Sequence, residues 1–549
     1  MKKRLEGLLQ HALLKSIEGG ALKIDGLPPL LFEVPKDRAF GDLATTVALG
    51  LAREARCAPR KIAEIITGHI DDADGLLAAT EIAGPGYINF RFSPRFWAQA
   101  LAEIERDDYG PDQLGIGRRV QVEFVSANPT GPLTIGHGRN AVLGDVLARL
   151  LEVTGHQVTR EYYFNNAGRQ MRVLGESVKA RYLELLGEPC TFPEGGYQGE
   201  YITLIAGTLQ GAHGAGLRAE PSDGRFKQAA ETAIFDDIKG TLERIGIRFD
   251  VYFNEDSLYS GGQIEAILGE LRARDLAFDS DGAVWLRGEP LGLNKDRVLM
   301  KSTGEPAYRL PDIAYHKDKL SRGFDLLIDV LGADHIAEHE EVRAALRALG
   351  YDVEKIKAII YQFVTLTRGG QQVKMSTRRA EYVTVDELVD EVGSDVVRFF
   401  FLTRKSDSHL EFDLDLAKKQ SSDNPVFYVQ YAHARVCSLL RQAASADRYP
   451  AAAAVSYLET LTAPEELAVV KLLAQYTETV EDAARTLEPH RVVFHLIELA
   501  SEFHRFYNRH RVLTDDPQRT AARLYLAGAV GKVIRSGLHL VGVSAPETM

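Results

Sequence analysis

The stretch VQVEFVSANPTGPLTIGHGRNAVLGDVLARLLEVTG, residues 120–155, changes its hydrophobic pattern partway along. It begins with alternating, β-branched residues, which indicate a strand, and ends with apolar residues at helical spacing. A loop rich in glycine and proline joins the two parts. A strand, a loop and a helix in this order predict the opening of an α/β nucleotide-binding domain.

His137 lies between Gly136 and Gly138, where this loop enters the predicted helix. Backbone N–H groups and the helix dipole can bind a phosphate at such a position, because both present positive charge. His137 would add a donor able to carry a positive charge and to stabilise charge on a phosphoryl group. Gly-His-Gly at a helix start also occurs in plain tight turns, so the motif alone leaves both interpretations open.

The sequence on either side predicts the rest of the sheet and two further domains. The apolar runs FDLLIDVLGADH (324–335) and IKAIIYQFVTLT (356–367) indicate buried parallel strands. Residues 175–270 are mostly helical in pattern and are expected to be an insertion that splits the sheet. We therefore predict a multidomain α/β protein, with an N-terminal α+β module at 1–112, a Rossmann-like domain at 113–405 and a C-terminal all-α helix bundle at 406–549.

Composition bounds the class of protein. At 549 residues the chain is too long for a single core, since a domain has roughly 150 residues. Hydrophobic residues make up 45% and charged residues 26%, which is typical of chains that fold throughout. The net charge of −12 argues against a protein coated in nucleic acid, so RNA would have to bind local basic surfaces.

Cysteine usage and hydropathy bear on the compartment. Cys57, Cys190 and Cys437 are far apart and odd in number, which excludes a disulfide framework and a Cys-x-x-Cys zinc motif. A reducing cytoplasm is therefore expected. The basic start reads as an amphipathic helix without a cleavage site, and no run approaches about 20 apolar residues, so we expect neither export nor a membrane span.

A second motif is GGQQVKMSTRRAEYVTVDEL, residues 369–388. Its two glycines would give a mobile entry, and Lys374, Arg378 and Arg379 form a cationic cluster. Thr384 and Glu387 have the spacing of a capping box that starts the next helix. Such a loop could close on a polyphosphate, and a solvated basic turn is the alternative.

The segments TIGH (134–137) and KMSTR (374–378) together resemble the HIGH and KMSKS signatures of class I aminoacyl-tRNA synthetases. They stand in the right order within one predicted α/β domain. Four longer segments are similar to arginyl-tRNA synthetases, at 123–140, 373–402, 423–440 and 542–549. The similarity covers nearly the whole chain and is weakest in the N-terminal module and near 190–230.

The resemblance implies a class I catalytic domain that activates L-arginine with ATP and Mg²⁺ to arginyl-adenylate. The arginyl group then passes to the 3′-terminal ribose of tRNA(Arg), and AMP and pyrophosphate are released. In this family the first step generally needs bound tRNA. The carboxylate attacks the α-phosphorus in line, so catalysis depends on positioning and charge neutralisation, without a covalent nucleophile. We expect a cytoplasmic monomer with no zinc or other protein-held metal and no DNA or membrane partner.

The resemblance also assigns residues position by position. Catalytic roles fall on Thr134, His137, Lys374 and Arg378. ATP binding falls on Gly136, His137, Gly332, Asp334, His335, Lys374, Met375 and Ser376. Arginine binding falls on Glu123, Ser126, Asn128, Tyr308 and Asp312. Binding of tRNA falls on Tyr428, Tyr431, Arg435, Tyr507 and Arg509, and in the N-terminal module on Phe40, Tyr87, Asn89 and Phe92.

Arginine selectivity needs a carboxylate opposite a planar guanidinium, because that fork-shaped pair rejects lysine geometrically. By similarity Tyr308 and Asp312 match the side-chain positions, and Glu123 and Asn128 match those near the amino and carboxylate ends. Pro311 is expected at the first helical position, which puts Asp312 in the first turn but not on the helical face of Tyr308. Judged locally, Asp312 could simply be an acid at a helix N-terminus.

The sequence departs from the family pattern at two positions. Thr134 stands for the first His of HIGH, and Thr377 stands for the second Lys of KMSKS. Members that lack this Lys often carry a substitute shortly before HIGH, where this chain has Gly131. Arg378, Arg379 or Arg139 could supply the missing charge, although a guanidinium fork is not equivalent to a point-charge Lys. Arg378 is our candidate, because it directly follows Thr377.

Aromatic and basic residues alternate in two predicted helices of the last domain, a pattern that suits stacking on unpaired bases and binding of phosphates. An ordinary charged face of a helix bundle is the alternative, as a small aromatic core is for the N-terminal module. Two other functions compete for the whole chain. One is a class I synthetase for leucine, cysteine or methionine, and the other is a non-catalytic tRNA-binding paralogue that keeps the fold.

Overall fold

The computed structural model describes residues 1–549 except 36, 107–108, 374–382 and 447–452. The basic loop predicted to meet the triphosphate, with Lys374, Met375, Ser376 and Arg378, therefore lies outside the described residues. None of the helices within these ranges is long and apolar enough to cross a bilayer.

A five-stranded parallel sheet forms the centre of the molecule, in the order β12-β11-β5-β6-β7. Its strands are β5 (Arg119–Glu123), β6 (Gln157–Phe164), β7 (Val251–Asn254), β11 (Leu326–Gly332) and β12 (Ile356–Tyr361). From β5 the chain first adds strands on one side and later on the other, so the order reverses between β5 and β11. Ligands of open α/β sheets bind at the carboxyl ends of the strands at such a switch point.

The opening stretch folds as predicted, because both of its halves are buried against each other. In β5, Val120 and Val122 are fully buried and pair with Leu326 and Ile328 of β11. The loop after β5 leads into α5 (Ile135–Val153), whose Gly144 lies so close to Phe124 that a Cβ there would overlap the ring. Gly144 therefore lets the helix pack directly on the sheet.

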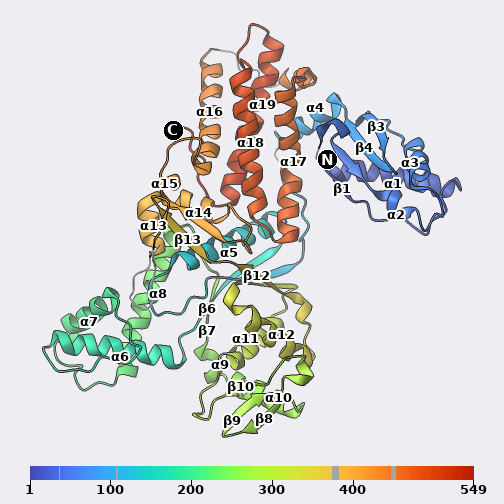
Figure 1. Ribbon diagram of the computed structural model, residues 1–549. Coiled ribbons are helices and arrows are strands. Elements are labelled where there is room, and N and C mark those ends of the chain that lie inside the picture. The colour runs from blue at the N-terminus through green and yellow to red at the C-terminus, as the bar shows by residue number, and fades with distance from the viewer. Residues whose placement is uncertain (36, 107–108, 374–382, 447–452) are drawn as a thin grey trace.

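The connection between β6 and β7 differs from the expected insertion at 175–270. Its helices, α6 (Gly168–Leu185), α7 (Glu200–His213) and α8 (Lys227–Arg244), extend away from the sheet (Figure 1). However, β7 falls inside the expected range and is the edge strand of the central sheet, paired with β6. A four-residue strand between helices carries too little periodicity to be seen in sequence.

A second connection, between β7 and β11, holds structure that the sequence did not predict. After α9 (Asp256–Ser260) and α10 (Gln263–Ala273) come three antiparallel strands, β8 (Ala277–Ser280), β9 (Ala283–Leu286) and β10 (Arg297–Met300). Then α11 (Arg309–Ser321) leads into β11, and α12 (Ile336–Ala348) leads from β11 into β12. These two helices pack against each other beside the sheet, in the lower part of Figure 1.

The N-terminal module is an antiparallel sheet packed with helices. The strand order is β1 (Phe32–Glu33), β2 (Leu43–Thr45), β4 (Tyr87–Phe92), β3 (Leu77–Ala83), and the helices are α1 (Lys2–Glu18), α2 (Val47–Leu51), α3 (Pro59–Gly68) and α4 (Pro94–Glu103). Asn89 and Phe92 are buried, and Phe92 stacks on Phe96 with centroids 4.1 Å apart. These two predicted tRNA contacts therefore belong to the module's interior, whereas Phe40 and Tyr87 are exposed.

The C-terminal part is a bundle of long helices, as predicted. A small sheet of β13 (Val364–Arg368), β14 (Gln371–Gln372) and β15 (Leu410–Asp413) comes first, together with α13 (Val385–Val392), α14 (Ser394–Phe401) and α15 (Leu414–Ala417). The bundle follows, with α16 (Pro425–Ser445), α17 (Pro464–Thr486), α18 (His490–Arg509) and α19 (Pro517–Leu540) (Figure 1). Asn424 caps α16 by accepting from the N–H groups of Val426 and Phe427.

Candidate active site

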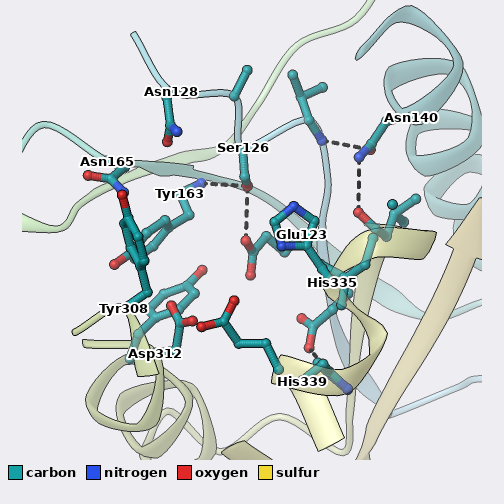
Figure 2. Close-up of a pocket in the computed structure, with 18 of the residues that line it drawn as sticks. Glu123, Ser126, Asn128, Asn140, Tyr163, Asn165, Tyr308, Asp312, His335 and His339 are labelled. Atoms are coloured by element: carbon teal, nitrogen blue, oxygen red, sulfur yellow. Dashed lines mark hydrogen bonds and ion pairs between the residues drawn. The ribbon is translucent and has the colours of Figure 1, made fainter. Parts of the chain in front are cut away.

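A cavity of about 500 Å³ lies at the switch point, outside the carboxyl ends of β5, β6 and β11 (Figure 2). The predicted site residues that line it are Glu123, Ser126, Asn128, His137, Tyr308, Asp312, Gly332 and His335. Residues that the sequence did not single out also line it, among them Asn140, Tyr163, His316, Asp329, Glu338 and His339. The fold thus brings together residues more than two hundred positions apart.

The loop after β5 enters the cavity with an unusual backbone. Val125 and Ser126 have φ values of 64° and 41°, which non-glycine residues rarely adopt. Asn140 of α5 holds this turn, because its Oδ1 accepts from Val125 N at 2.8 Å and its Nδ2 donates to the carbonyl oxygen of Val330 at 3.0 Å. Asn140 therefore holds the loop against β11. In the sequence, the only indication of this role was the amide side chain itself.

The turn directs Ser126 toward Glu123. The Ser126 hydroxyl donates to Glu123 Oε1 at 2.9 Å and accepts from the N–H of Tyr163 at 3.1 Å. The side chain of Ser126 therefore orients the carboxylate of Glu123, while Asn128 lines the same wall of the cavity (Figure 2).

His137 is neutral, contrary to the expectation that it can carry charge. Burial lowers its pKa to about 4. Its Nδ1 accepts from the backbone N–H of Thr134 at 3.2 Å, so the ring proton is on Nε2. Thr134 is the N-cap of α5 and does not itself line the cavity. At this position in the motif, Thr134 therefore begins the helix as its N-cap and sets the tautomer of His137.

The two glycines of the motif differ in their surroundings. A Cβ at Gly138 would lie 2.9 Å from Cγ2 of Val385 and 3.1 Å from the Phe401 ring, so Gly138 permits α5 to pack on α13 and α14. A Cβ at Gly136 would have no neighbour closer than 3.8 Å, although Gly136 itself does not line the cavity. The Val385 N–H donates to the carbonyl oxygen of Leu133 at 2.9 Å, so the start of α13 is fixed beside the start of α5. The capping box of Thr384 and Glu387 is confirmed.

Tyr308 and Asp312 lie one turn apart on α11, which corrects the prediction that they occupy different faces. The helix begins at Arg309, so Pro311 is its third residue and not its first. Proline is tolerated there because the first N–H groups of a helix have no partner within it. The Asp312 N–H donates to the carbonyl oxygen of Tyr308 at 3.2 Å, and both side chains reach the same cavity.

The carboxyl group of Asp312 lies in an acidic setting. Burial raises its pKa well above the ordinary value, and the negative charges of Glu338, Glu255 and Glu123 raise it further, while Lys319 opposes them. Within the described part of the chain, neither Asp312 nor Glu338 has a hydrogen bond or ion pair to its carboxylate. The cavity therefore presents negative charge that the rest of the described structure does not neutralise.

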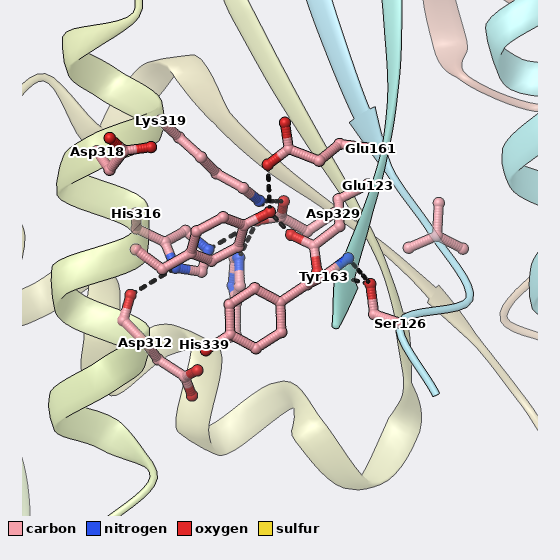
Figure 3. Close-up of polar contacts among 12 residues, drawn as sticks. Glu123, Ser126, Glu161, Tyr163, Asp312, His316, Asp318, Lys319, Asp329 and His339 are labelled. Atoms are coloured by element: carbon pink, nitrogen blue, oxygen red, sulfur yellow. Dashed lines mark hydrogen bonds and ion pairs between the residues drawn. The ribbon is translucent and has the colours of Figure 1, made fainter. Parts of the chain in front are cut away.

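A buried ionic network lies beneath this wall, and sequence reasoning missed it (Figure 3). Lys319 of α11 is fully buried and pairs with Glu123 and, at 2.6 Å, with Asp329 Oδ1. Nε2 of His316 and Nε2 of His339 each lie 3.1 Å from Asp329 Oδ2. Although burial opposes ionisation, Lys319 and His316 hold the pKa of Asp329 well below its usual range. In the sequence, the indication of this network was Asp329, an acidic residue within the apolar run of β11, because a buried carboxylate needs partners.

His316, Asp329 and His339 are also spaced closely enough to hold a metal ion, their ligand atoms lying within 4.8 Å of one another. The ammonium of Lys319 already balances the charge of Asp329. For the site, the main effect of this network is on Glu123. Lys319 fixes the second carboxylate oxygen of Glu123, while Ser126 fixes the first.

The segment after β11 provides the opposite wall of the cavity. Gly332 and His335 line it, and Tyr361 at the end of β12 lies beside them. Asp334 is exposed, does not line the cavity, and lies 3.6 Å from His335 Nε2. Of the three residues predicted for this segment, Gly332 and His335 therefore reach the cavity and Asp334 does not.

The predicted tRNA-binding residues of the bundle form one cluster, apart from Arg509. The guanidinium of Arg435 lies 4.6 Å from the ring centroids of Tyr431 and Tyr507, and it donates to the Tyr431 hydroxyl at 3.0 Å. Tyr428 joins through His504, whose ring lies 4.6 Å from its own. Arg509 instead pairs with Glu465 of α17.

Comparison with known proteins gives matches along the whole chain. Residues 3–92 match the family model described as the arginyl tRNA synthetase N terminal domain. Residues 102–189 and 212–402 match the catalytic domain of class I (R) tRNA synthetases, and residues 429–549 match the DALR anticodon binding domain.

Individual relatives agree with these models. The arginine–tRNA ligase of Desulfotalea psychrophila is 51% identical over 551 residues, covering 100% of both chains. That of Chlorobaculum parvum is 48% identical, covering 94% of this chain and 95% of its own. A solved structure of a putative arginyl-tRNA synthetase from Campylobacter jejuni has a TM-score of 0.74 at 33% identity, covering 83% of this chain and 99% of its own. The Thermus thermophilus arginyl-tRNA synthetase shares the fold, with a TM-score of 0.78 at 23% identity and complete coverage of both chains.

Proposed function

The chain belongs to the arginyl-tRNA synthetase family, and we propose how the residues of its cavity divide that family's reaction among them. The protein is an ATP-dependent ligase that joins L-arginine to tRNA(Arg). Arginine first reacts with ATP to give arginyl-adenylate and pyrophosphate. The terminal ribose hydroxyl of the tRNA then attacks the arginyl carbonyl, and AMP leaves.

Asp312 and Tyr308 bind the guanidinium group. The observation that carries this assignment is the carboxyl group of Asp312, which lines the cavity without a partner among the described residues and has a raised pKa. A guanidinium would supply the positive charge that favours the ionised carboxylate. Its planar fork also matches the geometry of a carboxylate, which the single ammonium of lysine does not.

Glu123 and Asn128 bind the amino and carboxylate ends of the substrate. Ser126 and Lys319 support the role of Glu123, because each fixes one of its oxygens. The reacting carboxylate of arginine would then lie near the start of α5, where the phosphates are expected. Holding both reactants in line for attack on the α-phosphorus is the main contribution of such a site.

ATP lies across the start of α5 and the segment after β11. Gly136 offers its backbone N–H at the helix N-terminus, and the Nε2–H of His137 is a neutral donor toward a phosphoryl oxygen. Gly332 and His335 would bind the adenosine, with Asp334 at the rim. Thr134 acts through His137, whose tautomer it sets.

Lys374, Met375, Ser376 and Arg378 complete the triphosphate site in this proposal, with Arg378 in place of the second Lys of the signature. Mg²⁺ enters with ATP, because it prefers phosphate oxygens together with one or two carboxylates, and this cavity contains carboxylates. Bound in this way, the ion would supply positive charge to the leaving pyrophosphate.

The tRNA anticodon binds the cluster of Tyr428, Tyr431, Arg435 and Tyr507, which offers aromatic rings for stacking and a guanidinium for phosphates. Arg509 contributes less in this proposal, since Glu465 compensates its charge. We further propose domain boundaries near 112 and 405, a monomeric state and a cytoplasmic location, the last supported by three free, scattered cysteines.

The test is tRNA-dependent pyrophosphate exchange with all twenty amino acids in turn, followed by charging with labelled arginine. Exchange with arginine alone, and only when tRNA is present, is expected. Exchange with leucine, cysteine or methionine would reveal another class I specificity. Binding of tRNA without charging would indicate a non-catalytic paralogue.

A further inference from the structure

Glu338 has no role in the assignments above, yet it lines the same cavity as Asp312, whose pKa its negative charge raises. It lies in the first turn of α12, which packs on α11, the helix that carries Asp312. Both side chains line the cavity and both are partly buried. Their helices thus bring two carboxylates to the same cavity.

Two carboxylates in a shared cavity repel each other unless a cation lies between them. In the described part of the chain, no lysine, arginine or hydrogen-bond donor pairs with either carboxylate. The contrast with Glu123 is informative, since it borders the same cavity and is held by Lys319 and Ser126. Asp312 and Glu338 are therefore arranged for a positively charged partner that none of the described residues provides.

A guanidinium group has more donors than one carboxylate can accept. It carries five N–H groups in a plane, and a bidentate pair with one carboxylate uses two of them. The remaining donors need acceptors once the group is desolvated, because an unpaired buried donor is unfavourable. A second carboxylate on a neighbouring helix can meet another edge of the same plane.

We propose that Glu338 is a specificity-determining residue for arginine, which binds the guanidinium from a second edge while Asp312 binds the first. The inference rests on the function proposed above and deepens it. Two carboxylates exclude neutral isosteres such as citrulline more strongly than one, because a neutral ligand would leave both negative charges uncompensated. A lysine ammonium would be too compact to meet both acceptors.

The experiment compares Glu338→Gln with the wild type and with Glu340→Gln in tRNA-dependent pyrophosphate exchange. Glu340 lies on the same helix, but it is exposed, pairs with Arg343 and does not line the cavity. We expect Glu338→Gln to raise the KM for arginine by about tenfold or more, with an unchanged KM for ATP. Its preference for arginine over citrulline should fall. Glu340→Gln should match the wild type in each respect.

An unchanged arginine KM in Glu338→Gln would overturn the inference. So would an increase confined to the KM for ATP, which would place Glu338 beside the nucleotide. A thermal unfolding curve checks that the variant is folded, and Glu338→Asp should recover part of the arginine affinity if the carboxylate itself matters. A wild-type enzyme inactive toward arginine would contradict the proposed function, whereas an active wild type with an unaffected variant contradicts this inference alone.

Discussion

At the scale of single residues, Asp312 links the electrostatics of the cavity to its choice of substrate. Its raised pKa means that the free site keeps a proton to a higher pH than an ordinary aspartate would. Arginine brings a permanent positive charge, which favours the ionised carboxylate. Binding of arginine is therefore expected to release a proton from Asp312.

The KM for arginine is therefore expected to depend on pH. As the pH falls through the raised pKa of Asp312, the carboxyl takes up a proton that arginine must displace, so the KM for arginine rises by up to roughly tenfold per pH unit. Exchange measured over a descending range of pH values checks this. Asp312→Asn should bind arginine weakly and without this dependence. A wild-type KM that is flat across the range would contradict the assignment.

The sequence could indicate Asp312 but not the environment of its carboxyl group. The resemblance gave Tyr308 and Asp312, whereas Glu338, Lys319 and Asp329 come from helices and strands whose contacts only the fold decides. The ionisation of His137 could not be predicted for the same reason, because the burial that lowers its pKa is a property of the packed site.

At the scale of helices and strands, Gly138 and Gly136 separate two roles within one motif. A methyl group at Gly138 would push against Val385 and Phe401, and so would move α5 away from α13. A methyl group at Gly136 would meet only the hydroxyl oxygen of Thr134, at 3.8 Å. The motif thus joins a close packing contact at Gly138 to loose surroundings at Gly136.

We expect Gly138→Ala to lower the free energy of unfolding by about 1–3 kcal/mol, since it overpacks a close helix contact. Gly136→Ala should leave stability nearly unchanged and raise the KM for ATP. Denaturant unfolding and exchange kinetics of the two variants measure this. Equal losses of stability in both would show that the motif has only a structural role.

Elements with a strong pattern were predictable, and short or tertiary-dependent ones were not. The strand and helix of 120–155 and the parallel pairing of β11 and β12 are confirmed. The strand β7 was hidden because it has four residues and depends on pairing with β6. The start of α11 was misplaced because proline was taken as the first helical residue.

At the scale of the whole molecule, the bundle and the catalytic sheet are joined through a buried arginine. Arg398 donates through Nε to the carbonyl oxygen of Val541 at 3.0 Å and through Nη1 to that of Ile245 at 2.7 Å, and it pairs with Asp145 of α5. Arg398 therefore connects the end of the bundle, helix α5 and the residue after α8 in one set of contacts.

Arg435 is the central cation of the proposed tRNA surface, which also includes Tyr428, Tyr431 and Tyr507. Arg435→Ala should raise the KM for tRNA about tenfold, since it removes a cation stacked between two tyrosine rings. Arg509→Ala should change it less, because Glu465 already pairs with Arg509. The KM for tRNA of both variants is measured in tRNA-charging assays at several salt concentrations, with arginine saturating. A larger effect of Arg509→Ala, or wild-type binding insensitive to salt, would contradict the proposed surface.

The most direct test of the account is the charging of tRNA(Arg) with labelled arginine by the wild type and by Asp312→Asn. We expect the wild type to form arginyl-tRNA with ATP, and the variant, although folded, to lose charging by about 100-fold or more because its cavity lacks the first guanidinium carboxylate. Charging by Asp312→Asn at the wild-type rate and arginine KM would contradict the account.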